Sequence, residues 1–360
     1  MRYLAALALF AGAFVGVGLA QPPGAQDRVY YIPKKGAAVK DEDAELKVDA
    51  AGVKIIVAPG AGKTAPTVTT VTVADIVRTY PVDIKDLARK DAAEPTRLEL
   101  ARDWDKARAE YETIKEKFKA SSTDRLRKWL AFRIAYTTTR AADDTPADSG
   151  WKDKAEAGLK LLNDYLADYP GGWEAWSATR TAARVSHELG KSEAAARLWA
   201  KAARAADVTP DLRVEAAYQE ADALVRAGRF SDAAGKASEA LSKAAPGAPK
   251  ERLNLIVLAA KAAGANPLDG VAALEAEVGK TKDAAVRATG YALMGELYLA
   301  GKKPREAMWA YLWVEVVYNQ DKEEVAKALA RLAEVFKQLG DEDRERSYHD
   351  RMRRNRALLL

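Results

Sequence analysis

The chain has 360 residues, of which 57 are basic and 52 acidic, and it contains no cysteine and only two histidines. The net charge of +5 is small for this length and the two signs are interleaved, so the composition argues against wholesale nucleic-acid binding. Without cysteine the chain forms neither disulfides nor thiolate metal sites. Its alanine-rich composition, with 30% charged and 8% aromatic residues, is typical of a soluble helical protein.

Residues 1–20 have the pattern of a cleaved secretory signal peptide. Arg2 gives a positive start, Leu4 to Val17 is apolar, and Gly18-Leu19-Ala20 is the ending that a signal peptidase accepts. We therefore expect cleavage after Ala20 and a periplasmic or secreted protein with no integral membrane span. The alternative is an uncleaved anchor, because Tyr3 to Ala20 is almost long enough to cross a bilayer.

A small β-rich module is predicted for residues 27–81, after a Pro/Gly-rich linker at 21–26 and before a second linker at 82–95. Short runs of β-branched and aromatic residues alternate in this module with Gly, Pro and Asp clusters. The runs are Val29–Ile32, Ala44–Val48, Val53–Val57, Val68–Val73 and Ile76–Arg78. This pattern predicts an all-β module of the SH3-like barrel type, closed or half closed.

The segment Val57 to Thr64, VAPGAGKT, resembles a phosphate-binding loop at first sight. Such a loop needs a glycine at its start and a helix directly after it. Val57 occupies the glycine position, and Pro66 followed by a β-branched run replaces the helix. The segment is therefore predicted to be a hairpin loop.

From residue 96 to residue 356 the apolar residues recur three and four positions apart, which predicts helices. Thr96 follows Pro95 and precedes Glu99 by three residues, so it is predicted to be the N-cap of the first helix, in a capping box. Later helix breaks fall at five glycines: Gly190, Gly228, Gly264, Gly301 and Gly340. Glycine suits a tight turn between helices because it tolerates a left-handed backbone.

The spacings between these glycines are 38, 36, 37 and 39 residues. A period of this length is typical of stacked helix pairs, because one pair alone cannot bury its apolar face. Extrapolation towards the N-terminus places another turn near Ser149-Gly150, and a first pair beginning near Thr96. The sequence thus predicts about six to seven units.

The residues around these turns resemble the tetratricopeptide repeat. The clearest copy comprises Tyr291, Met294, Gly295, Tyr298, Ala307 and Tyr311. Ala195 and Trp199 form part of a second copy, whereas Glu220 falls where the pattern has leucine. That departure indicates either a register shift or a carboxylate with a buried partner. The signal peptide, the β-module and the segment Trp309–Lys322 also resemble secreted tetratricopeptide proteins of bacteria such as planctomycetes.

The resemblance implies a mainly α fold, a right-handed superhelical solenoid whose concave face is lined by the first helix of each pair. Residues on that face would bind a protein or peptide segment of unknown identity. They would be basic near the N-terminus and mixed to acidic near the C-terminus. The residues are Arg180, Arg184, His187, Tyr218, Asp222, Arg226, Glu296, Glu334 and Lys337.

No catalytic, cofactor or metal site is expected. His187 and His349 lack the spacing of metal ligands, and His187 is predicted to be an ordinary residue on a helix surface. Two alternatives to a binding scaffold remain open. One is a cell-envelope enzyme, for example one acting on glycan, with carboxylates converging from several repeats. The other is a structural protein that self-associates through an edge strand of the β-module.

An aromatic group at Trp309, Tyr311, Trp313 and Tyr318 has two interpretations. Tyr311 fills the packing position of the repeat, whereas Trp309 and Trp313 lie four residues apart on another face. The group is either an interlocked hydrophobic stack or part of a groove for a partner.

Overall fold

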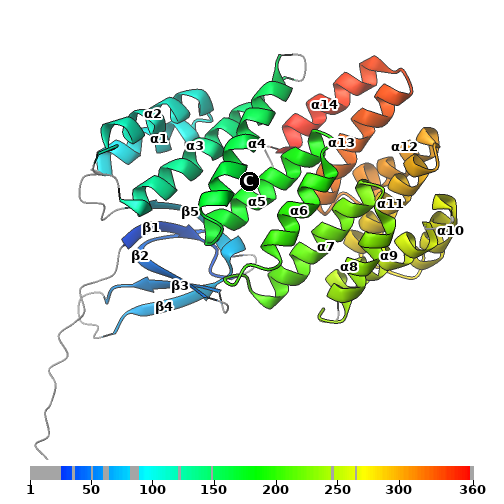
Figure 1. Ribbon diagram of the computed structural model, residues 1–360, viewed down its shortest axis with the longest axis horizontal. Helices are drawn as coiled ribbons and strands as arrows, with labels where there is room; N and C mark the ends of the chain where they lie inside the picture. Colours follow the sequence, from blue (N-terminus) through cyan, green and yellow to red (C-terminus); the bar gives the residue numbers. More distant parts are fainter. Residues whose placement is uncertain are drawn as a thin grey trace, which may run out of the picture.

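The structure is a computed structural model in which a small sheet precedes a curved array of helices (Figure 1). It describes residues 26–34, 37–49, 52–59, 65–81, 89–120, 123–146, 149–244, 247–263 and 266–356. The predicted signal peptide, Gly264 and residues 60–64 of the glycine-rich segment lie outside the described residues. None of the helices in the described ranges is both long and apolar enough to cross a membrane.

Five strands form one antiparallel sheet in the order β4-β3-β2-β1-β5, with a short 3-10 helix, η1 (Val73–Asp75), before the last strand. The strands are β1 (Gln26–Tyr31), β2 (Lys40–Asp49), β3 (Gly52–Val57), β4 (Thr67–Val71) and β5 (Ile76–Pro81). Strand β1 pairs with both its sequence neighbour β2 and the last strand β5. The predicted all-β module is confirmed as a small antiparallel sheet.

Every second residue along β1 and β3 contributes to the core of the sheet. Val29 and Tyr31 of β1 and Val53 and Ile55 of β3 are fully buried, two positions apart on each strand. Side chains at that spacing point to the same face of a sheet. The register between β3 and β4 pairs Val57 with Thr67 in the antiparallel sense. The segment between them therefore joins two strands of a hairpin, as predicted, rather than a strand and a helix.

The described residues contain fourteen α-helices that pack in successive pairs. The first seven are α1 (Arg89–Leu100), α2 (Trp104–Lys117), α3 (Asp124–Asp144), α4 (Trp151–Asp168), α5 (Trp173–Glu188), α6 (Ser192–Ala202) and α7 (Pro210–Arg226). The others are α8 (Phe230–Leu241), α9 (Ala248–Ala263), α10 (Pro267–Val278), α11 (Ala284–Ala300), α12 (Pro304–Leu312), α13 (Lys322–Gln338) and α14 (Glu342–Arg356). They form seven pairs, at the upper end of the predicted number.

The first pair begins earlier than the sequence predicts. Helix α1 starts at Arg89, within the predicted linker, so Thr96 lies inside the helix and its hydroxyl donates to the Ala92 carbonyl at 2.7 Å. The predicted N-cap and capping box at Thr96 are therefore wrong. Ala92 and Leu98 are buried, and this packing offsets the hydrogen bond that Pro95 cannot donate.

The turns between the two helices of a pair are mostly as predicted. Gly190, Gly228 and Gly340 have φ of 72°, 72° and 74°, the left-handed values that favour glycine. Gly301 differs, because its φ is −79° and Lys302 takes the left-handed position with φ of 58°. At that turn the chain reverses one residue later than the glycine indicates.

The clearest motif copy packs as the repeat pattern requires. Gly295 of α11 faces Tyr311 of α12 so closely that a Cβ atom on Gly295 would lie 2.5 Å from the ring. The fully buried Tyr311 donates its hydroxyl hydrogen to Glu296 Oε1 at 2.9 Å. Glu220, the departure from the motif, is buried with Lys236 Nζ at 3.8 Å, and burial raises its pKa.

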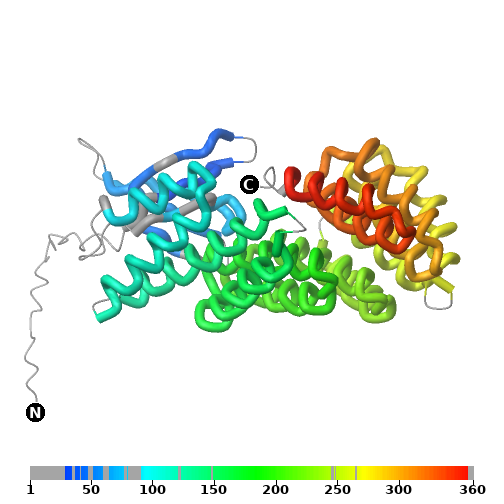
Figure 2. Tube along the Cα trace, turned by 90° about the horizontal axis from the view of Figure 1, so that it is seen from above, coloured from blue at the N-terminus to red at the C-terminus, as the bar shows by residue number. Residues whose placement is uncertain are grey.

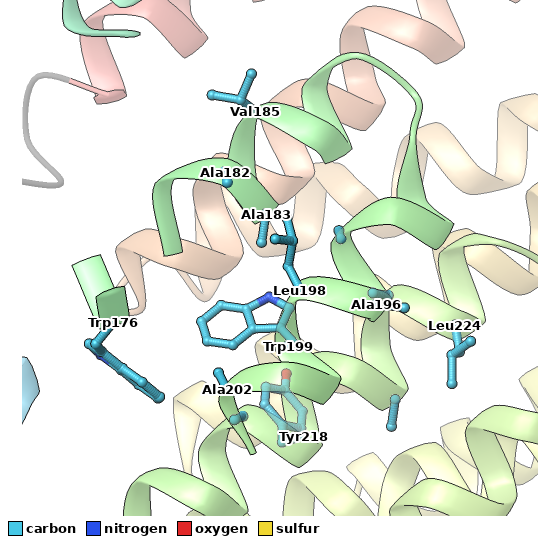
Figure 3. Packing of buried hydrophobic residues seen from close by; sticks show 14 of the residues in the cluster. Trp176, Ala182, Ala183, Val185, Ala196, Leu198, Trp199, Ala202, Tyr218 and Leu224 are labelled. Carbon is cyan, nitrogen blue, oxygen red and sulfur yellow. The ribbon is translucent and has the colours of Figure 1, made fainter. Parts of the chain in front are cut away.

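The middle helix pairs share one hydrophobic core with the β-module, and two smaller cores lie at the N-terminal and C-terminal ends of the array. Trp176 of α5 and Trp199 of α6 meet edge to face with ring centroids 5.7 Å apart, a favourable arrangement of aromatic rings. Figure 3 shows these rings with Tyr218 of α7 and with small alanines that let neighbouring helices approach closely. The array curves strongly, and the last helices return towards the N-terminal ones, with α14 contacting α3 (Figure 2).

Candidate functional site

A cavity of about 540 Å³ lies where this curvature brings distant parts of the chain together. Its walls come from the β-module, from helices α1 to α3, from α5 to α7 and from α13. Ile32, Val73 and Ile76 of the β-module give one apolar edge. The volume is in the range of about 300–1,000 Å³ that is usual for pockets holding compact ligands.

One face of α5 forms the longest wall. The lining positions recur three or four residues apart, which is the spacing of one helix face. They are Trp173, Trp176, Ser177, Arg180, Thr181, Arg184, His187 and Glu188. The predicted partner-binding residues Arg180, Arg184 and His187 therefore line a cavity, and Arg226 of α7 is a fourth that does so.

Ion pairs organise the wall formed by α3. Arg133 binds Glu99 of α1 through two contacts, one of them from Nε to Oε1 at 2.9 Å. Asp143 Oδ2 accepts from Arg140 at 2.7 Å and from Arg184 of α5 at 2.8 Å. Arg140 Nε and Nη2 have no hydrogen-bond acceptor among the described residues. The Arg140 guanidinium lies over the ring of Trp104, 5.5 Å from its centroid.

Helix α13 closes the opposite side. Lys327 Nζ lies 2.9 Å from Asp222 and 3.0 Å from Gln219, both on α7. Arg331 donates to the carbonyl of Arg226 at 3.2 Å. Glu323 forms an ion pair with Arg180 of α5 where both side chains are partly exposed, at 41% and 45%. The C-terminal unit is thus fastened directly onto the inner face of the middle units.

This closure changes the predicted binding face. Tyr218 donates to Glu324 at 3.0 Å, and Arg226 contacts Asp222 at 3.1 Å and Glu296 at 3.2 Å. All five side chains are buried in contacts within the chain. Tyr218, Asp222, Arg226 and Glu296 are therefore brought together, but as internal partners rather than as an open surface.

The last two predicted residues lie elsewhere. Glu334 is partly exposed and forms an ion pair with Arg331 at 2.6 Å. Lys337 is largely exposed, and its nearest acidic partner is Glu345 Oε1 at 3.9 Å. Neither of these residues lines the cavity.

His187 is half-buried on the cavity wall, so its prediction as an ordinary surface residue is wrong. Burial lowers the pKa of His187 well below its ordinary value of 6.5, and the nearby Arg226, Lys327 and Arg331 lower it further, against an opposing effect of Asp222. The imidazole is therefore neutral at pH 7. Its Nδ1 lies 3.4 Å from the Ser192 hydroxyl.

Basic side chains dominate the cavity lining within the described residues. Eight lysine and arginine side chains contribute to it, against three carboxylates, Glu99, Glu188 and Glu323. Burial alone would lower the pKa of Arg184, but Asp143 and Glu188 raise it above its ordinary value, so the side chain stays charged. Asp143, Asp222, Glu296 and Glu324 are buried carboxylates outside the lining, and they form ion pairs with five of these cations.

Across the part of the chain that the structure describes, nothing in this arrangement forms an acid/base pair of the kind that a glycan-acting enzyme uses. Glu99, Glu188 and Glu323 are paired with Arg133, Arg184 and Arg180 respectively. Glu215 has a pKa raised by burial and by nearby Glu323, but Glu215 does not line the cavity. No cluster of three or more metal-ligating side chains is found among the described residues.

Sequence reasoning missed the contribution of α13. Glu323, Lys327 and Arg331 lie four residues apart, and this pattern of acidic and basic side chains is also typical of an exposed helix face. Arg140 and Asp143 of α3 were missed because they lie in a polar segment of the sequence. No local signal distinguishes these residues from solvated ones.

The aromatic group around α12 contains the predicted hydrophobic stack. Trp313 and Tyr318 stack on Tyr291, with centroids 5.5 and 5.3 Å from its ring, and Tyr311 is buried. Trp309 stays outside the stack and is 62% exposed. Trp313, Val316 and Val317 are also exposed, so an apolar surface remains on the π-helical turn Trp313–Val317 that follows α12.

Seven stacked helix pairs, one of which contains an almost complete copy of the motif, define a helical-repeat protein with a tetratricopeptide-like fold. No protein-family model and no curated protein matches the sequence. Among solved structures, a tetratricopeptide repeat protein from Parabacteroides merdae is 13% identical, with a TM-score of 0.44 over 73% of this chain and 91% of that one.

Two further structures are similar to a lesser extent. A Rap protein complexed with competence and sporulation factor is 14% identical, with a TM-score of 0.36 over 74% of this chain and 76% of that one. BtubC from P. vanneervenii is 16% identical, with a TM-score of 0.30 over 58% and 90%. With TM-scores below 0.5, these similarities extend no function to this chain, and the fold rests on its own helix pairing.

Proposed function

We propose that the protein is a non-enzymatic interaction scaffold of the cell envelope that takes an acidic segment of a partner protein into its central cavity. The observation that supports this proposal is the lining, in which eight basic side chains face a space of about 540 Å³. An acidic segment would approach these cations more closely than it approaches the buried carboxylates outside the lining. Electrostatic complementarity of this kind favours selection among partners and fast association.

The envelope location rests on the sequence of residues 1–20, which has the charge and hydropathy pattern of a secretory signal. Mass spectrometry of the mature protein tests this part, and a chain that begins at Gln21 is the expected result. Recovery of Met1 on the mature protein would contradict cleavage.

Arg180 is the best residue for testing partner binding, because it is 45% exposed at the opening of the cavity. Arg184 is less suitable, because its charge is held by the buried Asp143 and Glu188, and reversing it would disturb the fold. The matched control is Arg197, an exposed arginine whose ion-pair partner among the described residues is Glu193 of its own helix and which does not line the cavity.

The experiment is a cross-linked pull-down from an envelope fraction, comparing the wild type, Arg180→Glu and Arg197→Glu at low and high salt. We expect the wild type and Arg197→Glu to capture a partner with an acidic segment, and Arg180→Glu to lose this capture. High salt should weaken the capture. Capture that is equal for all three proteins would contradict binding at the cavity.

We also propose that the β-module can pair two copies of the chain through β4. This strand is at the edge of the sheet, and its Val68 side chain is 54% exposed. An exposed edge strand presents unpaired backbone groups that a second strand can bind. Light scattering on the wild type and Val68→Lys tests this, with a dimer that dissociates in the variant as the expected result. A wild-type monomer at all concentrations would contradict it.

A further inference from the structure

The cavity combines cations with flat apolar surfaces, and this combination restricts what it can hold. Six aromatic side chains contribute to the lining: Trp104, Phe132, Tyr136, Trp173, Trp176 and Trp199. Arg133 lies 5.0 Å from the centroid of Tyr136, and Arg140 lies over Trp104. The positive charges are therefore interleaved with ring faces and edges rather than gathered at one end.

We infer that the cavity is a selective site for a compact ligand that joins an anionic group to a planar apolar body. The anionic group would be a carboxylate, and the planar body an aromatic ring. A carboxylate near Arg140 and Arg184 would be in reach of guanidinium donors, which bind such groups in fixed geometry. The ring would pack against Trp173 and Trp176 of α5, which offer offset and edge-to-face contacts.

Two features of the wall are consistent with this chemistry. Arg140 has two N–H groups, at Nε and Nη2, with no acceptor among the described residues, and Trp176 Nε1 has none either. Buried donors without an acceptor are costly, so a ligand oxygen that reached them after a small side-chain adjustment would bind favourably. Leu100, at the opening, is 71% exposed and extends the apolar surface outwards.

Both a small aromatic acid and an acidic-aromatic pair of residues in a partner segment have this chemistry. The inference deepens the proposed function, because it names the side chains that a partner segment would insert. It can also be tested without the partner. A cavity of this size holds one such group rather than a long extended segment.

The test uses the full chain and two matched sets of probes. The first set is 2-naphthoate, its neutral analogue 2-naphthalenemethanol and the non-planar cyclohexanecarboxylate. The second set is the acetylated and amidated tripeptides Glu-Trp-Glu, Gln-Trp-Gln and Lys-Trp-Lys. Binding is measured by isothermal titration calorimetry at low salt, and again in 0.5 M salt.

We expect 2-naphthoate or Glu-Trp-Glu to bind about tenfold or more tightly than its neutral and basic counterparts, since one charge-assisted hydrogen bond gives roughly that ratio. Binding of 2-naphthoate alone would identify a small-molecule ligand and would count against a protein partner at this site. Binding of Glu-Trp-Glu alone would identify a partner segment. Equal binding of charged and neutral probes, or of none, would overturn the inference.

Two variants place the ligand. Ser177→Trp adds bulk to the α5 wall without removing an ion pair, and we expect it to abolish binding while circular dichroism stays unchanged. Arg180→Gln removes one charge at the opening and should weaken binding about threefold to tenfold, whereas Arg197→Gln should have no effect. Undiminished binding by a folded Ser177→Trp protein would contradict the location, and Arg180→Gln gives an independent check if Ser177→Trp fails to fold.

Discussion

Lys327 of α13 and Asp222 of α7 form a buried ion pair with a distance of 2.9 Å, although 105 residues separate them in the chain. A repeat array needs only contacts between neighbouring units, so this pair shows that the helical array curves more tightly than stacking alone requires. The same closure brings α13 across the inner face and forms one wall of the cavity. Lys327 therefore both holds this closure and lines the proposed binding cavity.

Breaking the closure should destabilise the protein strongly. Lys327→Met would leave Glu324 buried without its ion-pair partner and Asp222 with Arg226 alone, and breaking a buried ion pair typically costs about 3–5 kcal/mol. The matched control is Lys243→Met, because Lys243 pairs with Glu239 on the exposed surface, and its loss should cost less than about 0.5 kcal/mol. Urea unfolding measures both values. Similar free energies of unfolding for the two variants would argue against closure through α13.

His187 should make stability fall as the solution becomes mildly acidic. Its pKa in the folded chain is lowered below the ordinary 6.5, mainly by burial and then by nearby Arg226, so only the unfolded chain gains this proton just below pH 6.5. The stabilisation is complete above pH 6.5 and is lost as the pH falls towards the lowered pKa. The loss is up to about 1.4 kcal/mol for each pH unit.

The experiment measures free energies of unfolding at pH 7.5 and pH 5.0 for the wild type, His187→Gln and His349→Gln. We expect the decrease in the free energy of unfolding between pH 7.5 and pH 5.0 to be smaller in His187→Gln and unchanged in His349→Gln. His349 is the control because it is the only other histidine in the sequence and lies on α14. An unchanged fall in His187→Gln would show that other groups cause it.

Two helix glycines should respond in opposite directions to the same change. In Gly295→Ala the new Cβ would meet the Tyr311 ring at 2.5 Å, and overpacking of this kind costs about 1–3 kcal/mol. Gly235, inside α8, has no atom within 4 Å of the position that a Cβ would take, so Gly235→Ala should stabilise by up to about 1 kcal/mol. Thermal unfolding distinguishes the two, and a neutral Gly295→Ala would contradict the close helix approach.

Neighbouring aromatic residues on α12 should also differ. Tyr311 is fully buried and donates to Glu296, so Tyr311→Ala should cost about 3–5 kcal/mol. Trp309 is 62% exposed, and Trp309→Ala should cost about 1 kcal/mol or less. A large loss of stability in Trp309→Ala would mean that its ring packs within the repeat. Chemical denaturation with tryptophan fluorescence and circular dichroism measures both variants.

Much of the fold was predictable because its signals are local. Alternation over residues 29–31 and 53–55 indicated the strands, and Gly190, Gly228 and Gly340 indicated the turns, since each depends only on a few adjacent residues. The prediction at Thr96 was wrong because the start of that helix depends on packing and not on adjacent residues. Thr96 has the pattern of an N-cap, but the burial of Ala92 extends the helix beyond it.

Of the candidate site, the sequence by itself determined the cavity-facing side of α5, because that depends on the helical period, but not that of α13. It thereby placed Arg180, Arg184 and His187 correctly on one face of α5. Only the tertiary structure decided which part of that face is open. Small differences in the angle between successive pairs add up over the four units from α7 to α14 and bring Lys327 against Asp222, and no local pattern encodes that sum.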